Sequence, residues 1–156
     1  MSREVNVYSP KDAAILPDEI VTQMAHRGVP IEWRFMLSSE RKKPAQWTAG
    51  YIYARGEVDQ QEPLSLSRVT IKSRLRASTI QFYQAVMTEH YRAALEAAKV
   101  VYQISVPLAV DERLLVTLVD VLAEMSDGLI LDTLPDRFYS LAEYRSAYTH
   151  ILGRNP

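Results

Sequence analysis

The chain has no cysteine among its 156 residues, which excludes disulfides, thiolate zinc sites and thiol nucleophiles. It also has no uninterrupted apolar run approaching the roughly 18 residues that would suggest a membrane-spanning helix. Its first residues lack the basic segment followed by an apolar run that is typical of a secretory signal. These absences predict a soluble, cytoplasmic protein.

Neither sign of charge is in excess, because 18 lysines and arginines face 19 acidic residues, for a net charge of −1. Binding to a phosphate backbone normally requires a basic excess, so the composition predicts no dedicated nucleic-acid binding. At this length a fold can bury about 70% of the surface of the unfolded chain. We therefore expect one domain that spans residues 1–156.

Glycine-rich phosphate loops and nucleophile elbows are missing, since G-x-G-x-x-G, G-x-x-x-x-G-K and G-x-S-x-G do not occur. The three histidines, His26, His90 and His150, stand far apart, and none has a histidine or carboxylate at the i, i+4 spacing of a helical metal site. The sequence predicts no catalytic residue, no metal site and no cofactor. We expect a protein that is not an enzyme.

Alternating apolar residues predict four strands in the first half of the chain, at residues 3–8, 29–37 and 47–54 and from 64 or 66 to 75. Pro17 and Gly28 indicate the start and the end of a helix between the first two strands, which gives a β-α-β unit. A polar loop at 38–44 and a turn over 55–63 connect the later strands without a helix. This favours an antiparallel meander.

The second half is mainly helical. Ser78-x-x-Gln81 has the form of a capping box and predicts a helix from 78 to about 98. Residues 100–106 are rich in β-branched side chains and favour a strand, although continuation of the helix is an alternative. Asp111 caps a further helix that ends at Gly128, and Ser140-x-x-Glu143 opens a last one. The order β-α-β-β-β-α-β-α-α predicts an α+β fold, a mixed and mainly antiparallel sheet with helices packed over one face.

The stretch RVTIKSRLR, residues 68–76, alternates basic or polar residues with mostly apolar ones. If its apolar side packs under helices, the other side presents its cations to solvent or to a partner. Whether the two tyrosines of the preceding strand lie beside these cations depends on the register in which the two strands pair. A solvated face that discourages edge pairing is the alternative. The candidate binding residues are Arg68, Lys72, Arg74, Arg76, Tyr51 and Tyr53, with the loop 40–44 beside them.

Three carboxylates, Asp127, Asp132 and Asp136, bracket the apolar run 129–131 and could perform acid–base chemistry if two of them met one substrate. Aspartates beside glycine or proline are also common turn formers, and we favour that interpretation. The alternative function is a small-ligand-binding protein or enzyme. Its cleft would lie between sheet and helices, with Tyr51, Tyr53, Asp132 and Arg137 on the rim.

Residues 125–140, MSDGLILDTLPDRFYS, resemble the ending of several uncharacterised bacterial α+β proteins, in which a helix is followed by glycine, an apolar pair, aspartate, a turn and tyrosine. Some of these proteins are immunity proteins of toxin systems. The resemblance implies a cytoplasmic protein that binds another protein and catalyses nothing. It assigns no residue a role, because such proteins bind toxins through variable surface loops. With the basic stretch, it predicts a protein partner of acidic character, and self-association is a third alternative.

Overall fold

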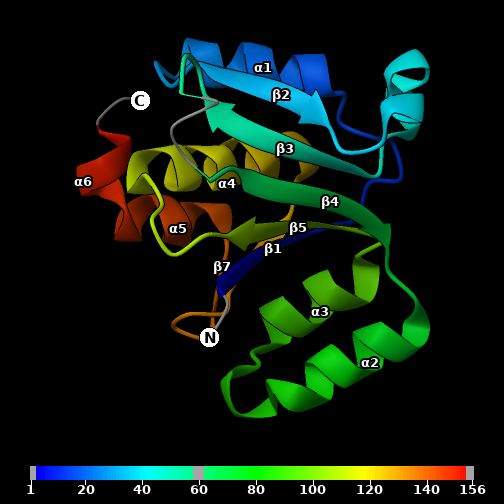
Figure 1. The fold of residues 1–156 in the computed structure, drawn as a ribbon. Helices are drawn as coiled ribbons and strands as arrows, with labels where there is room; N and C mark the ends of the chain where they lie inside the picture. Colours follow the sequence, from blue (N-terminus) through cyan, green and yellow to red (C-terminus); the bar gives the residue numbers. More distant parts are fainter. Residues whose placement is uncertain (1–2, 58–61, 154–156) are drawn as a thin grey trace.

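In the described part of the chain, seven strands form one antiparallel sheet in the order β2-β3-β4-β5-β1-β6-β7 (Figure 1). The computed structural model describes residues 3–57 and 62–153, so the predicted turn over 55–63 lies partly outside the described residues. The predicted α+β class is confirmed, and every described strand pair is antiparallel rather than mixed. The strands are β1 (Arg3–Ser9), β2 (Ile31–Phe35), β3 (Ala49–Ala54), β4 (Leu64–Thr70), β5 (Val100–Val106), β6 (Leu129–Asp132) and β7 (Arg137–Tyr139).

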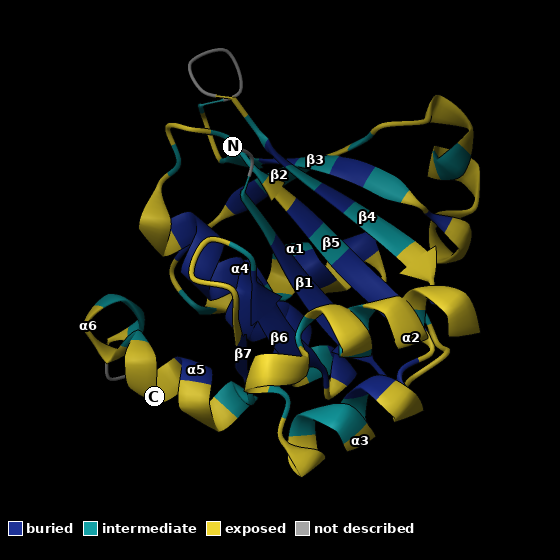
Figure 2. Cartoon of the chain, turned by 90° about the horizontal axis from the view of Figure 1, so that it is seen from below, coloured by how far each residue is buried: buried dark blue, intermediate teal, exposed yellow. Residues whose placement is uncertain are grey.

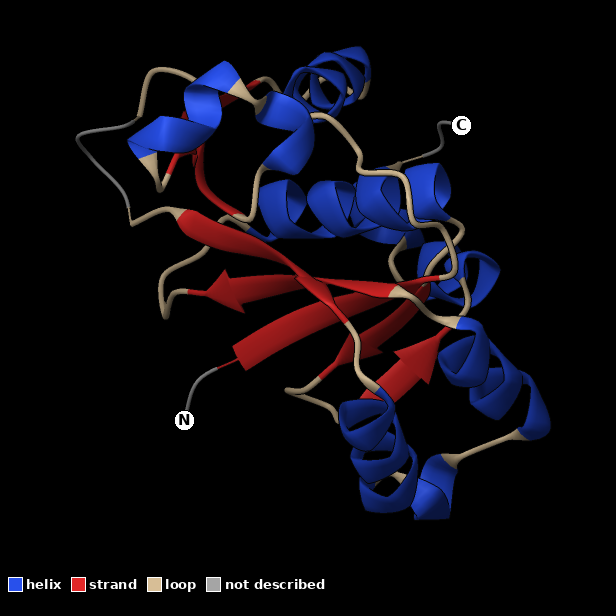
Figure 3. Cartoon of the chain, turned by 90° about the vertical axis from the view of Figure 1, so that its right-hand side faces the viewer, coloured by secondary structure: helices blue, strands red, loops and turns tan. Residues whose placement is uncertain are grey.

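Helices lie on both faces of the sheet, where the sequence predicted cover on one face (Figure 3). In the part of the chain that the structure describes, no helix is long and apolar enough to cross a membrane. The helices are α1 (Pro17–His26), α2 (Ser73–Phe82), α3 (Glu89–Ala97), α4 (Glu112–Ser126), α5 (Leu141–Ala147) and α6 (Thr149–Leu152), with 3-10 turns η1 (Ser38–Lys42), η2 (Pro44–Gln46) and η3 (Gln84–Val86).

The larger core lies on what we call the first face, beneath α1, α4 and α5. Because alternate side chains of a strand point to opposite faces, Val5 and Val7 of β1 enter this core while Tyr8 does not. Helix α4 is buried on most of its sides, since α1 and α5 flank it and the sheet lies beneath it. The helix therefore anchors the first face.

The second face has a smaller core beneath α3. Leu95 of this helix is buried in one cluster with Tyr8 of β1 and Phe138 of β7, and Tyr91 and Ala94 pack against that cluster. Helix α2 contacts α3 but buries none of its own residues, and it is exposed along most of its length (Figure 2). On the second face, α3 therefore covers β1 and β6, which lie toward one side of the sheet.

The predicted strand from 64 or 66 to 75 begins at Leu64 but ends earlier than predicted. The predicted helix at 78–98 is two helices, and Ser78 lies inside the first of them rather than at a cap. Strand β4 ends at Thr70, and α2 begins at Ser73. Ile71 explains the departure: it packs into the core of the second face, and its N–H donates to the Lys99 carbonyl at 3.0 Å. Helix α3 has its own cap, because the Thr88 hydroxyl accepts from the Tyr91 N–H at 3.1 Å.

Several predicted signals are confirmed by hydrogen bonds. The Asp111 carboxylate accepts from the Arg113 N–H at 2.9 Å, and Ser140 and Glu143 form both bonds of the capping box, at 3.1 and 2.7 Å. Residues 100–106 are strand β5. Helix α4, however, ends in a left-handed Asp127 (φ 54°), and the following Gly128 serves close packing, since a Cβ there would lie 2.3 Å from Val7 Cγ1.

Candidate functional site

The six predicted binding residues do not gather on one surface. Arg68 is paired with Tyr102, whose side chain belongs to the core of the first face, so the Arg68 side chain lies on that face. Tyr51 is paired with Ser65. Because Ser65 and Arg68 are an odd number of residues apart in one strand, Ser65 and Tyr51 lie on the second face. The Arg68 guanidinium donates to the carbonyls of Trp47 and Ala45 at 3.0 and 3.3 Å and lies over the Trp47 ring. This arginine therefore holds the β2–β3 connection in place.

Arg76 also serves the fold. Its Nε donates to the Leu95 carbonyl at 3.0 Å and its Nη2 to the Ala98 carbonyl at 2.6 Å. These carbonyls lie at the C-terminal end of α3, where the helix leaves acceptors free and where a positive charge is favourable. The guanidinium thus ties α2 to α3, so it is engaged within the chain.

Tyr51 and Tyr53 lie on β3, and Arg34 of β2 lies beside them on the second face. The Arg34 guanidinium is 5.8 Å from the centre of the Tyr53 ring and pairs with Glu32 at 2.9 Å. The neighbouring loop 40–44 forms η1 and the start of η2, and Glu40 fixes it by accepting from the Thr48 N–H at 3.0 Å. The tyrosines form a cluster of their own, away from the cations of α2.

The remaining two cations, Lys72 and Arg74, lie exposed at the start of α2, and three exposed apolar side chains follow them in α2 and η3. The exposed fractions of Leu75, Phe82 and Val86 are 44, 77 and 48%. Leu75 and Phe82 are seven residues apart, or about two helical turns, and so share one side of α2. We call Lys72, Arg74, Leu75, Phe82 and Val86 the α2 surface. The chain has no acidic residue between Glu62 and Glu89, so α2 itself contributes no carboxylate. Asp136 of the β6–β7 turn borders the far end of this surface, where it lines a hollow together with Val86.

The opposite side of α2 fixes its orientation. Ile80 and Tyr83 pack toward the core of the second face, and the Tyr83 ring lies 5.3 Å from that of Phe138. The Tyr83 hydroxyl donates to Asp136 at 3.3 Å, and burial together with this carboxylate raises the pKa of Tyr83 to about 12. Phe82 packs edge-on against Tyr83, with ring centres 4.8 Å apart, and is held outward.

A cavity of about 830 Å³ lies on the other side of the molecule, among the end of α1, the outer side of α4 and the α5–α6 segment. It lies among helices rather than between sheet and helices, and the predicted rim residues Tyr51, Tyr53, Asp132 and Arg137 do not line it. Its walls are His26, Arg27, Arg113, Thr117, Asp120, Glu124, Arg145, Ser146, Thr149, Ile151, Leu152 and Gly153.

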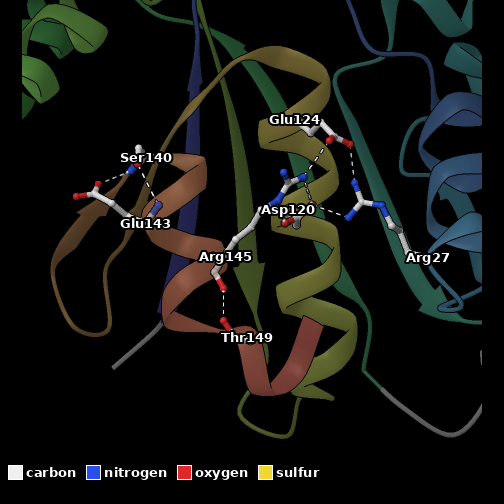
Figure 4. A network of polar contacts seen from close by, with 7 residues as sticks. All are labelled: Arg27, Asp120, Glu124, Ser140, Glu143, Arg145 and Thr149. Carbon is white, nitrogen blue, oxygen red and sulfur yellow. Dashed lines mark hydrogen bonds and ion pairs between the residues drawn. The ribbon is translucent and has the colours of Figure 1, made fainter. Parts of the chain in front are cut away.

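An ion-pair network forms one wall of this cavity (Figure 4). Asp120, whose side chain is 1% exposed, accepts from Arg27 and from Arg145, the latter through Nε at 2.7 Å and Nη2 at 3.0 Å. Glu124 accepts from the same two arginines, at 2.6 and 2.9 Å. The network joins three helical segments that are distant in sequence. Sequence reasoning missed it, because charge patterns indicate partners only within one helix.

The pKa of Asp120 is below its ordinary value. Burial acts to raise this pKa, but hydrogen bonds from Arg145 and Arg27 and their positive charges outweigh it. The stabilising contribution of Asp120 is therefore complete above the unfolded carboxyl pKa of about 3.9 and is lost as the pH falls through the lower folded value. We expect the urea midpoint of the wild-type protein to fall more steeply below about pH 4 than that of Asp120→Asn. Equal slopes for the two proteins would contradict the assignment.

The three aspartates of the acid–base hypothesis have separate partners. Asp132 is fully buried and receives a bidentate pair from Arg3, at 2.7 and 3.2 Å. Asp127 pairs with Lys11 at 3.2 Å, and Asp136, in a left-handed turn, accepts from Tyr83. The turn interpretation suits Asp127 and Asp136, whereas Asp132 is a buried ion-pair partner.

Within residues 3–57 and 62–153, no group of three or more His, Cys, Asp or Glu side chains could hold a metal ion. His26 lines the cavity, while His90 and His150 lie on α3 and α6. Comparisons with protein-family models, curated proteins and solved structures found no match.

Proposed function

We propose that this chain is a non-enzymatic binding protein of the bacterial cytosol that acts through an acidic protein partner docking on the α2 surface. The observation that carries the proposal is the exposed pair Leu75 and Phe82 on one side of α2, a helix that buries none of its residues. Lys72 and Arg74 stand at its start, and the exposed Val86 of η3 follows its end. Grouped apolar side chains at a polar surface are typical of an interaction site. This surface retains two of the six residues that the sequence singled out.

The chemistry of the α2 surface suits a protein rather than a small molecule. Leu75 and Phe82 are exposed on one side of a helix, so a partner must supply the complementary groove. Burying a side chain such as Phe82 or Leu75 stabilises a complex by about 1.5–3 kcal/mol. Lys72 and Arg74 add long-range attraction to a negative partner and raise the association rate. No ion pair among the described residues includes Lys72 or Arg74, so both charges are available to a partner.

The resemblance of residues 125–140 to immunity proteins of toxin systems supports a toxin as the partner. The resemblance implies a protein that catalyses nothing, which agrees with the engagement of Asp120 and Asp132 in ion pairs and of Glu143 in a helix cap. A regulatory protein that binds an acidic protein would use the same surface. In either case the helix is the binding element and the sheet is its support.

The test is a double substitution, Leu75→Ser with Phe82→Ser. The tagged wild-type protein is used to recover the partner from cells that produce it, and the purified partner is then titrated. We expect the dissociation constant to rise about 100-fold, since two apolar anchors are lost, while the free energy of unfolding changes by only about 0.5 kcal/mol per substitution. Arg74→Glu should weaken binding mainly at low salt.

The matched control is Leu108→Ser, which changes a fully exposed leucine outside the α2 surface. It should leave both the dissociation constant and the stability unchanged. The proposal fails if the double variant binds the partner like the wild-type protein. If Tyr51→Ala with Tyr53→Ala abolishes binding while the α2 variant does not, the interface lies on β3 instead.

A further inference from the structure

The cavity among α1, α4 and the α5–α6 segment has the size of a small-molecule site. Its volume of about 830 Å³ falls within the range of about 300–1,000 Å³ that is usual for ligand pockets. Three separate helical segments supply its walls. The ion pairs of Asp120 with Arg27 and Arg145 fix these segments relative to one another. The walls are therefore held in place before any ligand binds.

Both carboxylates of the wall are already engaged. The two oxygens of Asp120 and the two oxygens of Glu124 each accept a hydrogen bond from Arg27 or Arg145. A cation entering the cavity would have to compete with guanidinium groups for every one of these oxygens. The chemistry of the wall therefore disfavours a positively charged ligand.

Arg113 supplies a positive charge that the carboxylates do not neutralise. Arg113 lies exposed in the first turn of α4. Its Nη2 atom lies close to Gly28, since a Cβ added to this glycine would be 3.4 Å from that nitrogen. Among the ion pairs of the described residues, none includes Arg113. Three arginines thus face two carboxylates in the cavity wall. The excess charge and the free guanidinium donors favour an anion.

The rest of the wall suits an apolar group with a few polar contacts. Ile151 and Leu152, both half-buried, line it together with the hydroxyl-bearing Thr117 and Ser146. We propose that this cavity binds a small organic anion, a carboxylate or phosphate ester that carries an apolar group, with Arg113 as the residue that recognises its charge. This site is separate from the α2 surface.

The test uses phenyl phosphate and benzoate as probes, titrated into the full chain and followed by calorimetry. We expect saturable binding of at least one of them, about tenfold tighter than binding of inorganic phosphate, because the ring adds apolar burial. Phenol, which has the ring but no charge, should not bind measurably. Arg113→Gln should weaken probe binding about tenfold or more, since it removes a charge-assisted hydrogen bond and no ion pair of the fold.

Arg74→Gln is the matched control, because it removes an exposed arginine of α2 and leaves the cavity intact. It should bind the probes like the wild-type protein, and Arg113→Gln should keep the wild-type melting temperature. Equal probe affinity of Arg113→Gln and wild type, or binding of neither probe at millimolar concentration, would overturn the inference. Neither result bears on the α2 surface, whose test uses the protein partner.

Discussion

Asp132→Ala is expected to lower the free energy of unfolding by about 3–5 kcal/mol, because it leaves the Arg3 guanidinium without its buried counter-ion. The Asp132 side chain is 0% exposed and that of Arg3 only 16% exposed. Asp132 also accepts from the Leu134 N–H at 3.1 Å, so the substitution leaves a second donor unpaired. Urea denaturation measures the loss, which corresponds to a decrease in melting temperature of roughly 10 °C.

The same ion pair provides its own controls. Glu112→Ala removes the exposed carboxylate that Arg3 also contacts, at 3.4 Å, and should cost less than about 1 kcal/mol. Arg3→Met with Asp132→Leu replaces the pair by apolar side chains and should cost less than Asp132→Ala alone. If Asp132→Ala is as stable as Glu112→Ala, Arg3 reaches water and the pair is not a stabilising contact.

Trp47→Ala is expected to destabilise the fold by about 3–5 kcal/mol, as large-to-small substitutions of buried aromatic residues do. The side chain is 0% exposed, and its indole N–H donates to the Ile15 carbonyl at 2.7 Å. Its ring contacts those of Trp33 and Tyr102, with centres 5.1 and 6.2 Å away. The substitution therefore opens a void and leaves a carbonyl without its donor, which thermal unfolding would reveal.

Trp47→Phe separates the two effects, since it retains much of the ring and removes the N–H. It should cost about 1–3 kcal/mol, the usual penalty of a buried polar group left unpaired. Arg68 lies over the Trp47 ring and should retain a cation–π contact with phenylalanine. A cost for Trp47→Phe as large as that for Trp47→Ala would assign the stabilisation to the hydrogen bond rather than to packing.

Local signals in the sequence predicted much of the fold. The capping box of Ser140 and Glu143, the cap at Asp111 and the β-branched run 100–106 each form the predicted element. Such signals depend on residues close in sequence, so they need no tertiary information. The pairing of β1 between β5 and β6 could not be predicted in this way, because strand neighbours are chosen by contacts between distant segments.

The candidate site was predicted less well, for a reason visible in residues 68–76. Their alternation fits a strand, but Leu75 and Arg76 also fit a helix, and a segment this short does not distinguish the two periods. Burial of Ile71 decides where the strand ends. Arg68 then lies on the face opposite to Tyr51, and only Lys72 and Arg74 remain as cations of an exposed helix.

The ion-pair network of the cavity could not be predicted from the sequence either. Arg27 and Asp120 are 93 residues apart, and Arg145 lies 25 residues beyond Asp120. None of the three residues belongs to a motif, and the sequence pattern of each helix predicts an ordinary charged residue on the surface at that position. Only the packing of α1 and α5 against α4 brings them together.

The central position of β1 affects how the chain is made. Strand β1 leaves the ribosome well before its neighbour β6, because 129 residues separate Arg3 from Asp132. Until β6 emerges, one edge of β1 has unpaired backbone groups, and the buried valines of this strand lack part of their cover. The sheet can therefore be completed only after β6 has emerged, and the sequence separation of these contacts favours slow folding.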